Sequence, residues 1–267
     1  MEKLPISLII IAHNEALNLS RCLDSIAPWI SEIVAVINDC TDETATILQS
    51  YNAKVIEHAW MGMTEQKNIA LSHATQPWVI NLDADEEVSP RLAECIRDFI
   101  TNQKQHQALG AYFPRKTWFL GRWIRHGDWY PDYTLRLFYR AASKFAGGKD
   151  HDSVTVDGTT LKLSGDLFHY SFPNLNFLLR KIISFSDHYL DRQLAKKKRF
   201  STLGTIFRAL WRFVRSYLLR LGFLDGFPGL FVAVQQAFAT FYRHSRLYEH
   251  EKRSIKPQPE ASDYAKK

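Results

Sequence analysis

The chain has 267 residues, of which 46% are hydrophobic and 23% are charged, and its formal net charge is +6. This composition is typical of a globular protein and argues against a disordered or low-complexity chain. Three scattered cysteines offer neither a metal-binding spacing nor a disulfide framework, so we expect a reducing compartment.

Targeting and membrane-spanning signals are not expected in this sequence. The first apolar run, Ile6–Ala12, is too short for a secretion signal. No segment reaches the ~18 uncharged apolar residues of a transmembrane helix.

The positive charge is concentrated toward the C-terminus. Residues 180–253 hold 15 basic and 5 acidic residues, whereas the remainder holds 19 basic and 23 acidic residues. This asymmetry indicates chemistry in the first part and contact with an anionic surface in the second.

Short apolar runs alternate with helical patterns over the first hundred residues. The predicted strands are Ile6–Ile11, Glu32–Asn38, Ala53–Glu57 and the run that starts at Trp78. The predicted helices are Leu19–Ile26, Glu43–Tyr51, Glu65–Ser72 and Ser89–Thr101. The alternation predicts an α/β fold with a mostly parallel sheet and flanking helices.

Polar residues follow these strands at the edge where open α/β sheets bind ligands. They are Asn14 and Glu15 after the first strand, Asp39 after the second, and Asp83 and Asp85 after the fourth. The spacing of Asp83 and Asp85 lets one loop present two carboxylates to a hard divalent cation, which also takes substrate phosphates as ligands. The alternative is a polar loop whose charges favour the N-terminus of the next helix, which Ser89 and Pro90 begin.

The pattern changes after residue 107. Ala111–Phe119, Thr134–Tyr139 and Thr160–Phe168 are predicted strands separated by loops, and helices are predicted from Leu175 nearly to Tyr248. We therefore expect a catalytic domain over residues 1–174, with halves at 1–101 and 108–174, a helical region over 175–254 and a flexible tail over 255–267. A P-loop, a GxGxxG motif and paired CxxC motifs are missing, which argues against an NTPase, a dehydrogenase and a zinc domain.

The basic region is amphipathic. Apolar residues recur at helical spacing between Ile206 and Leu221, with arginines between them and the run Lys196–Arg199 just upstream. A helix of this length spans ~25 Å, which is too short for a ~30 Å hydrocarbon core, so it would lie on an anionic membrane surface. The alternative is a helical subdomain with a solvated basic face; nucleic acid is not expected because no recognised motif accompanies the charges.

Several motifs in order resemble a known family. They are Ile9–Glu15, Asn38–Asp42, Gln66–Asn68 and Leu82–Asp85. Together they resemble the nucleotide-sugar half of a family 2 inverting glycosyltransferase with the GT-A fold. Tyr130–Phe138, the pair His151 and Asp152, and Gly222–Gly226 resemble motifs of lipopolysaccharide inner-core β-1,4-glucosyltransferases.

The resemblance implies transfer of a sugar, UDP-glucose being the expected donor, to a lipid-linked saccharide at the inner face of the cytoplasmic membrane. It also implies a Mg²⁺ or Mn²⁺ ion, with Asp85 as direct ligand and Asp83 as ribose or metal-site residue. The residues implied in nucleotide-sugar binding are Ala12, Asn14, Glu15, Asp39, Lys67, Asp83, Ala84 and Asp85. One departure concerns recognition of the donor's nucleobase: Ile37 and Asn38 stand where many relatives have an Asp-Asp or Asp-Ser pair.

The general base is expected on the acceptor side. Asp132 is the first candidate because Pro131–Leu135 resembles the base-carrying motif of relatives; Asp152 is second and Asp128 third. Asp132 could equally be a turn residue. The other residues implied on the acceptor or diphosphate side are Trp129, Tyr130, Arg136 and His151. For these, the alternatives are core aromatics and a structural ion pair.

Two rival functions are kept open. One is a catalytically silent membrane-docking protein of the same fold, and the other is a glycosyltransferase that acts on a protein or a soluble saccharide.

Overall fold

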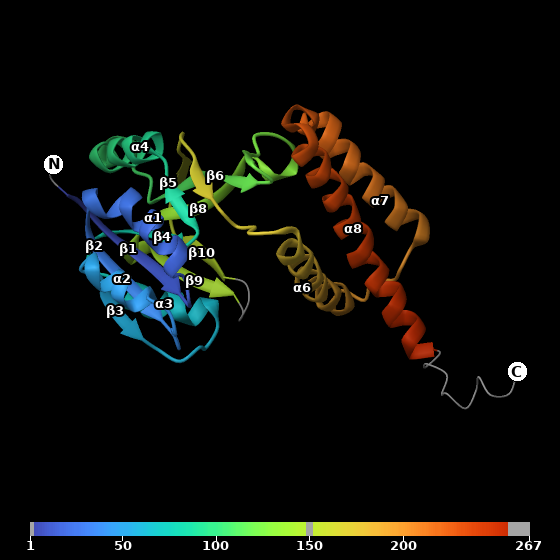
Figure 1. The fold of residues 1–267 in the computed structure, drawn as a ribbon, viewed down its shortest axis with the longest axis horizontal. Coiled ribbons are helices and arrows are strands. Elements are labelled where there is room, and N and C mark those ends of the chain that lie inside the picture. The colour runs from blue at the N-terminus through green and yellow to red at the C-terminus, as the bar shows by residue number, and fades with distance from the viewer. Residues whose placement is uncertain (1–2, 148–151, 256–267) are drawn as a thin grey trace, which may run out of the picture. The chain divides into compact units, whose positions relative to one another are not determined.

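The computed structural model describes residues 3–147 and 152–255, which belong to two compact units (Figure 1). The first unit comprises residues up to Trp118 together with Pro131–Ser171, and the second comprises Phe119–Tyr130 and the residues from Phe172 onward. The segment 119–130, which we expected in the half over residues 108–174, therefore groups with the C-terminal helices.

The first half of the first unit alternates strands and helices as predicted. Its elements are β1 (Leu4–Ala12), α1 (Ala16–Ile26), β2 (Ile30–Ile37), α2 (Thr44–Ser50), β3 (Lys54–Glu57), α3 (Met63–His73), β4 (Trp78–Asp83), β5 (Glu86–Val88), α4 (Pro90–Thr101) and the single turn α5 (Gln103–His106). Ser89 caps α4 as expected, since its hydroxyl accepts a hydrogen bond from the Leu92 N–H at 3.2 Å and Pro90 occupies the first helical position.

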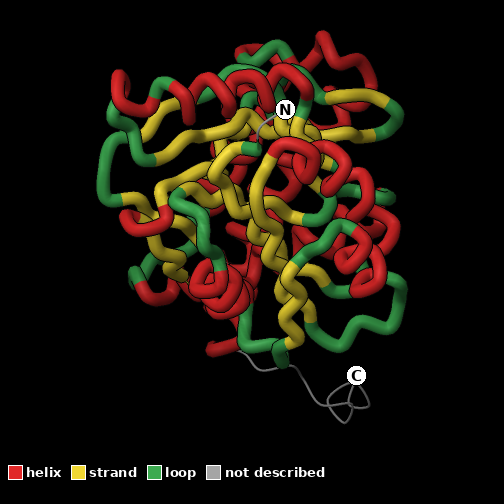
Figure 2. The backbone as a smooth tube through the Cα atoms, turned by 90° about the vertical axis from the view of Figure 1, so that its left-hand side faces the viewer, coloured by secondary structure: helices red, strands yellow, loops and turns green. Residues whose placement is uncertain are grey.

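The second half is richer in strands. They are β6 (Gly110–Phe119), β7 (Arg122–Trp123), β8 (Asp132–Tyr139), β9 (Ser143–Gly147), β10 (Asp152–Val156), β11 (Thr160–Lys162) and β12 (Leu167–His169). Within the described residues the main sheet has the order β3-β2-β1-β4-β8-β6-β12-β5, with β7 and β11 paired to β6. The strands are the yellow segments of the backbone in Figure 2. The neighbours β3, β2, β1 and β4 are parallel, and β8 is antiparallel to both β4 and β6.

Helices cover both faces of the parallel strands. Successive residues of β1 point to opposite faces: Leu8 and Ile10 join the core that includes α1 and α4, whereas Ile9 joins the core that includes Ala70 of α3. A strand that is buried on both faces has no alternating polar positions, which explains the continuous apolar run. The predicted mostly parallel α/β fold with flanking helices is therefore confirmed.

Several predicted elements differ from the structure. The expected strand Thr160–Phe168 is two strands, β11 and β12, separated by Gly165 at φ +88°. A Cβ at Gly165 would lie 2.5 Å from the Leu92 amide nitrogen, so the chain can approach α4 here only as glycine. The strands β5, β7, β9 and β10 were not predicted, because each is short and lacks a continuous apolar run.

The second unit contains α6 (Leu175–Ala195), α7 (Thr202–Val214), a π-helical turn (Arg215–Leu219), a 3₁₀ turn (Gly222–Asp225) and α8 (Gly226–Ile255). The helical prediction from Leu175 nearly to Tyr248 is confirmed, and α8 continues to Ile255. Pro228 lies in the first turn of α8, where its missing N–H costs no hydrogen bond. None of the described helices is alone long and apolar enough to cross a membrane; a bent pair, 202–219 with 222–252, meets that test by length and composition.

A buried carboxylate holds the second unit together. Asp225 accepts hydrogen bonds from the backbone N–H groups of Arg125 and His126 at 2.9 and 2.8 Å, and the Arg122 guanidinium lies 3.3 Å from it. A carboxylate that receives several donors is stable in a buried position. The motif Gly222–Gly226 therefore has a structural role: it ties the 122–127 loop to the start of α8.

Candidate active site

Asp83 and Asp85 end up with different partners. Asp83 is the last residue of β4, and its carboxylate lies 2.6 Å from the Arg136 guanidinium and 3.6 Å from the Lys67 ammonium. Asp85, in the turn before β5, lies with Oδ2 3.4 Å from Nε2 of His169. The carboxylates of Asp83 and Asp85 therefore interact with different groups, although only one residue separates them.

Asp83 belongs to a row of side chains with alternating charge, which we call the ion-pair row. Arg136 also contacts the fully buried Glu86 at 2.6 Å, and Arg115 lies 3.6 Å from Glu86. Arg115 in turn donates two hydrogen bonds, of 3.0 and 2.6 Å, to Oδ2 of Asp132. In order, the row is Asp132, Arg115, Glu86, Arg136, Asp83 and Lys67.

Strand register assembles this row. Arg115 of β6 is the cross-strand partner of Asp132 of β8, and Arg136 lies further along β8. Glu86 opens β5, whose partner β12 is also paired to β6. Groups that are far apart in sequence therefore meet at one edge of the sheet.

The electrostatic effect of the row is strong at its buried centre. Burial raises the pKa of Asp83, but the adjacent Arg136 and Lys67 outweigh it and hold that pKa well below its usual value. Burial lowers the pKa of Arg136, but Asp83 and Glu86 outweigh it and raise that pKa. Both groups are therefore charged at neutral pH.

Lys67 is a buried cation rather than a solvated helix residue. It projects from α3, is only 3% exposed, and its ammonium lies 5.8 Å from the centre of the Phe145 ring. A buried ammonium beside a carboxylate edge is well placed to attract a further anion.

His169 was not expected as a site residue. It ends β12 opposite Glu86 of β5, and the neighbouring Tyr170 N–H donates to the Asp85 carbonyl at 2.9 Å. Only the strand pairing brings this histidine to the acidic loop, so no local sequence signal marks it. Asp85 and His169 supply one carboxylate oxygen and one imidazole nitrogen, a donor set that suits Mg²⁺ or Mn²⁺ when phosphate and water complete the shell. Across residues 3–147 and 152–255, no three or more histidines, cysteines or acids form a complete metal site.

The loops after β1 and β2 are joined at the same edge. Asn14, at φ 56°, accepts a hydrogen bond from the Thr41 N–H at 2.8 Å, and it does not cap α1. Asp39 is exposed, with φ 43°. Ala12 and Ala84 are buried and supply backbone.

Glu15 precedes α1 and faces this acidic edge. Burial raises its pKa, and the negative charges of Asp85, Asp42 and Asp83 raise it further, although a hydrogen bond from Asn18 opposes them. A bound cation at this edge would relieve that repulsion.

The base candidates have different surroundings. The Asp132 side chain is 45% exposed, with Arg115 on one oxygen. Asp152 begins β10, but its side chain and the whole of His151 lie outside the described residues. Asp128 is buried in the second unit among Arg212, Arg215 and Arg220, at 2.6, 3.2 and 3.2 Å.

The aromatic candidates belong to the second unit. Trp129 stacks on Phe172 at a centroid distance of 5.0 Å and meets the edge of Phe119 at 5.1 Å. It therefore anchors the core of that unit, which is the alternative that the sequence left open. Tyr130 is half-buried and follows the 3₁₀ turn Gly127–Trp129.

Comparisons with known proteins agree with this geometry. The glycosyl transferase family 2 model matches residues 7–155. An uncharacterized glycosyltransferase of Rickettsia typhi is 29% identical over 91% of this chain and 87% of its own length. The lipopolysaccharide core biosynthesis glycosyltransferase LpsC of Rhizobium meliloti is 26% identical over 98% of this chain and 97% of its own length.

Solved structures give a more distant likeness. Staphylococcus aureus TarS 1–349 aligns with a TM-score of 0.49 and 15% identity, covering 97% of this chain and 76% of that one.

Proposed function

Because this chain belongs to glycosyl transferase family 2 and is thus a glycosyltransferase, we propose that it moves a sugar from a nucleotide sugar to a lipid-linked, lipopolysaccharide-core saccharide with inversion. The likeness to LpsC along nearly the whole length of both chains supports this acceptor class. UDP-glucose is the proposed donor, although Ile37 and Asn38 do not offer the carboxylate that many relatives place near the base.

The observation that carries the proposal is the pair Asp85–His169 beside the buried cations Lys67 and Arg136. Asp85 and His169 would hold a divalent cation, with Asp83 supporting the site from the neighbouring position. A cation held there would withdraw charge from the donor diphosphate as the bond to the sugar breaks. Lys67 would add a fixed positive charge to the same edge.

Asp132 is the proposed base. In the single step, the acceptor hydroxyl oxygen attacks the anomeric carbon, its proton passes to Asp132, and the bonding electrons leave with the nucleoside diphosphate. Arg115 contacts only Oδ2 in the hydrogen bonds that it donates, so Oδ1 is the oxygen proposed to take the proton. Asp152 remains the second candidate.

Membrane association is proposed for the second unit, at the inner face of the cytoplasmic membrane. Its helices carry large apolar side chains that are strongly exposed, including Leu203 at 81%, Phe207 at 68% and Phe227 at 68%. Arg208, on the same helix as Leu203 and Phe207, complements anionic headgroups. Replacement of Leu203 and Phe207 by serine should abolish flotation with anionic vesicles while sugar transfer to a soluble acceptor fragment persists.

Thermal shift with nucleoside diphosphates, with and without Mn²⁺, tests the donor site. A raised melting temperature with UDP only when Mn²⁺ is present is the expected result. Loss of this effect in Asp85→Asn, but not in Asp98→Asn on the exposed face of α4, would assign it to the site. Stabilisation by UDP that is the same with and without Mn²⁺, and the same in Asp85→Asn as in the wild type, would contradict the proposed donor site.

Transfer assays separate the rival functions. Labelled sugar should pass from UDP-glucose to lipopolysaccharide-core acceptors in membrane extracts. Transfer only to proteins or soluble sugars would replace the acceptor class, and donor binding without transfer to any acceptor would indicate the silent membrane-docking protein.

A further inference from the structure

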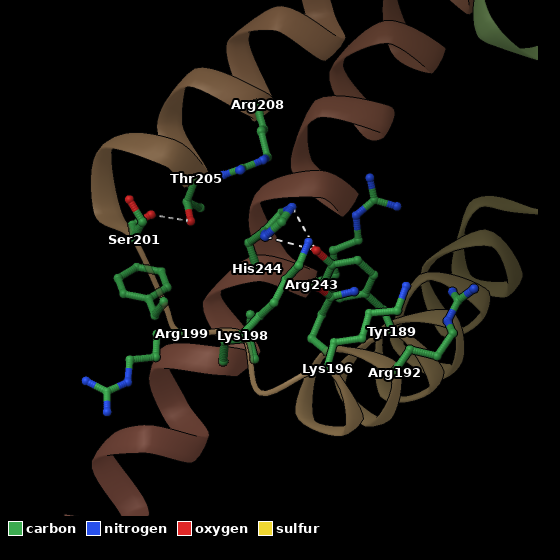
Figure 3. A pocket seen from close by; sticks show the side chains of 13 residues that line it. Tyr189, Arg192, Lys196, Lys198, Arg199, Ser201, Thr205, Arg208, Arg243 and His244 are labelled. Carbon is green, nitrogen blue, oxygen red and sulfur yellow. Dashed lines mark hydrogen bonds between the residues drawn. The ribbon is translucent and has the colours of Figure 1, made fainter.

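The second unit contains a pocket whose lining is strongly cationic (Figure 3). Its volume is about 420 Å³, and it is formed by α6, α7, α8 and the segment 196–201. Among the described side chains that line it, none is acidic. Six are basic: Arg192, Lys196, Lys198, Arg199, Arg208 and Arg243.

The floor of the pocket is half-buried. Arg243 lies with its guanidinium 5.2 Å from the centre of the Tyr189 ring, and the Tyr189 hydroxyl lies 3.1 Å from the His244 imidazole (Figure 3). Burial lowers the pKa of Arg243, and the charge of Arg192 lowers it further. Burial also lowers the pKa of His244, and with Arg208, Arg243 and Lys198 nearby it falls to about 4. The His244 imidazole is therefore neutral at physiological pH, because burial and the neighbouring cations disfavour a further positive charge in the pocket.

A concentration of like charges around one cavity weakens the fold through repulsion, so it calls for a ligand that relieves it. One carboxylate offsets a single cation. A phosphate group carries up to two negative charges and presents several acceptor oxygens, which match the forked geometry of arginine. Phosphate chemistry therefore fits this lining best.

Arg243 also lines a second cavity of about 230 Å³. The walls of that cavity include Trp129, Phe172 and Phe185, and it lies within the same unit. A ligand that joins a phosphate to an apolar group could contact both cavities through Arg243.

We propose that the cationic pocket of the second unit binds a phosphate group, and that the group belongs to an anionic lipid whose apolar part enters the adjacent cavity. The inference does not depend on which sugar is transferred. In addition to the exposed apolar surface, the second unit would thus have a specific binding site for the phosphate headgroup of one lipid.

Inorganic pyrophosphate, titrated onto the full-length protein in EDTA, tests the phosphate chemistry. EDTA and the Asp85→Asn background remove metal-dependent binding at the donor site, and the difference between the pocket variant and its control isolates the contribution of the pocket. The double variant Lys198→Gln/Arg208→Gln should weaken binding by roughly 10-fold or more for each cation removed. The matched control Arg180→Gln/Lys252→Gln removes two exposed cations outside the pocket and should leave binding unchanged.

Vesicle flotation distinguishes the source of the phosphate. Phosphatidylcholine vesicles containing phosphatidate should bind the protein better than vesicles of equal charge containing phosphatidylglycerol, which exposes no phosphomonoester. Lys198→Gln/Arg208→Gln should remove that preference and the control pair should keep it. Pyrophosphate binding without any vesicle preference would retain the phosphate site and reject the lipid source. Pyrophosphate binding that is equal in the wild type and in Lys198→Gln/Arg208→Gln would overturn the whole proposal.

Folding of the double variant is checked separately. Because the two removed cations repel their neighbours, the variant without ligand should melt at the same or a higher temperature than the wild type. A lower melting temperature would mean that these residues stabilise the fold and would count against a ligand site.

Discussion

The carboxylate of Asp85 and the imidazole of His169 lie 3.4 Å apart, although 83 residues separate them in the chain. Their approach depends on the antiparallel pairing of β5 with β12, in which His169 pairs with Glu86, the residue that follows Asp85. A carboxylate and an imidazole at this distance could both donate to one divalent cation at this edge of the sheet.

Removal of this pair should disable metal-dependent catalysis. We expect Asp85→Asn to lower sugar transfer by roughly 100-fold or more, since charge stabilisation by a cation is worth several kcal/mol. His169→Ala should raise the Mn²⁺ concentration needed for half-maximal rate by about 10-fold or more. Initial rates across a Mn²⁺ titration measure both effects. Unchanged Mn²⁺ dependence in His169→Ala would exclude the histidine as a ligand.

Asp132→Asn should lower kcat by roughly 100- to 10,000-fold while leaving donor binding nearly intact, because it removes the proposed proton acceptor. Single-turnover rates together with UDP affinity separate the two quantities. Asp128→Asn offers the comparison, because Asp128 is buried among three arginines. Its replacement should lower the melting temperature, whereas the kcat of the protein that remains folded should change little. A full rate in Asp132→Asn would transfer the base role to Asp152.

Arg136→Met should destabilise the first unit by about 3–5 kcal/mol, because it leaves the buried Glu86 and its neighbour Asp83 without their shared cation. The free energy of unfolding from urea titration measures this loss. Arg140→Met, at an exposed position in the 3₁₀ turn after β8, is the control and should change stability by well under 1 kcal/mol.

A double variant identifies the cause of that loss. Adding Glu86→Gln to Arg136→Met removes the uncompensated negative charge and should recover part of the stability. If the changes in unfolding free energy caused by the two substitutions are additive, the loss arises from packing and not from charge.

Stability should fall in acid because of Asp83. Its folded pKa lies below the unfolded value of about 3.9, so its contribution is complete above that value and is lost as the pH falls through the lower folded pKa. Urea titrations at about pH 5 and about pH 3 should show a smaller difference for Asp83→Asn than for the wild type. Asp98→Asn, on exposed α4, should retain the wild-type difference.

Much of the fold could be predicted because its signals are local. The buried strand Leu4–Ala12 is apolar except for Ser7, and Ser89 with Pro90 marks the start of α4 within a few residues. The short strand β5 has no such signal. Its residues Glu86 and Glu87 adopt extended structure because β12 supplies hydrogen-bonding partners, which is information that a local window does not contain.

The acidic positions of the candidate site could likewise be predicted, but their partners could not. Asp83 and Asp85 stand out by spacing, whereas Arg115 and His169 look like ordinary strand residues until register brings them to the carboxylates. Asp128 and Asp225 show the converse, because both stand in loops that the sequence marks as functional. Asp128 is buried in ion pairs with three arginines, and Asp225 is a buried hydrogen-bond acceptor.

The ion-pair row has a consequence for how such sequences diverge. Every inner member faces an opposite charge on each side, so a lone reversal would create two repulsive contacts, and these cost most at the buried Glu86 and Arg136. Drift at these positions should therefore be concerted: a sign exchange between Arg115 and Asp132 alone would set an acid at position 115 against Glu86, so tolerated reversals would have to extend along the row. Such correlated changes would be visible in descendants long after overall identity has faded.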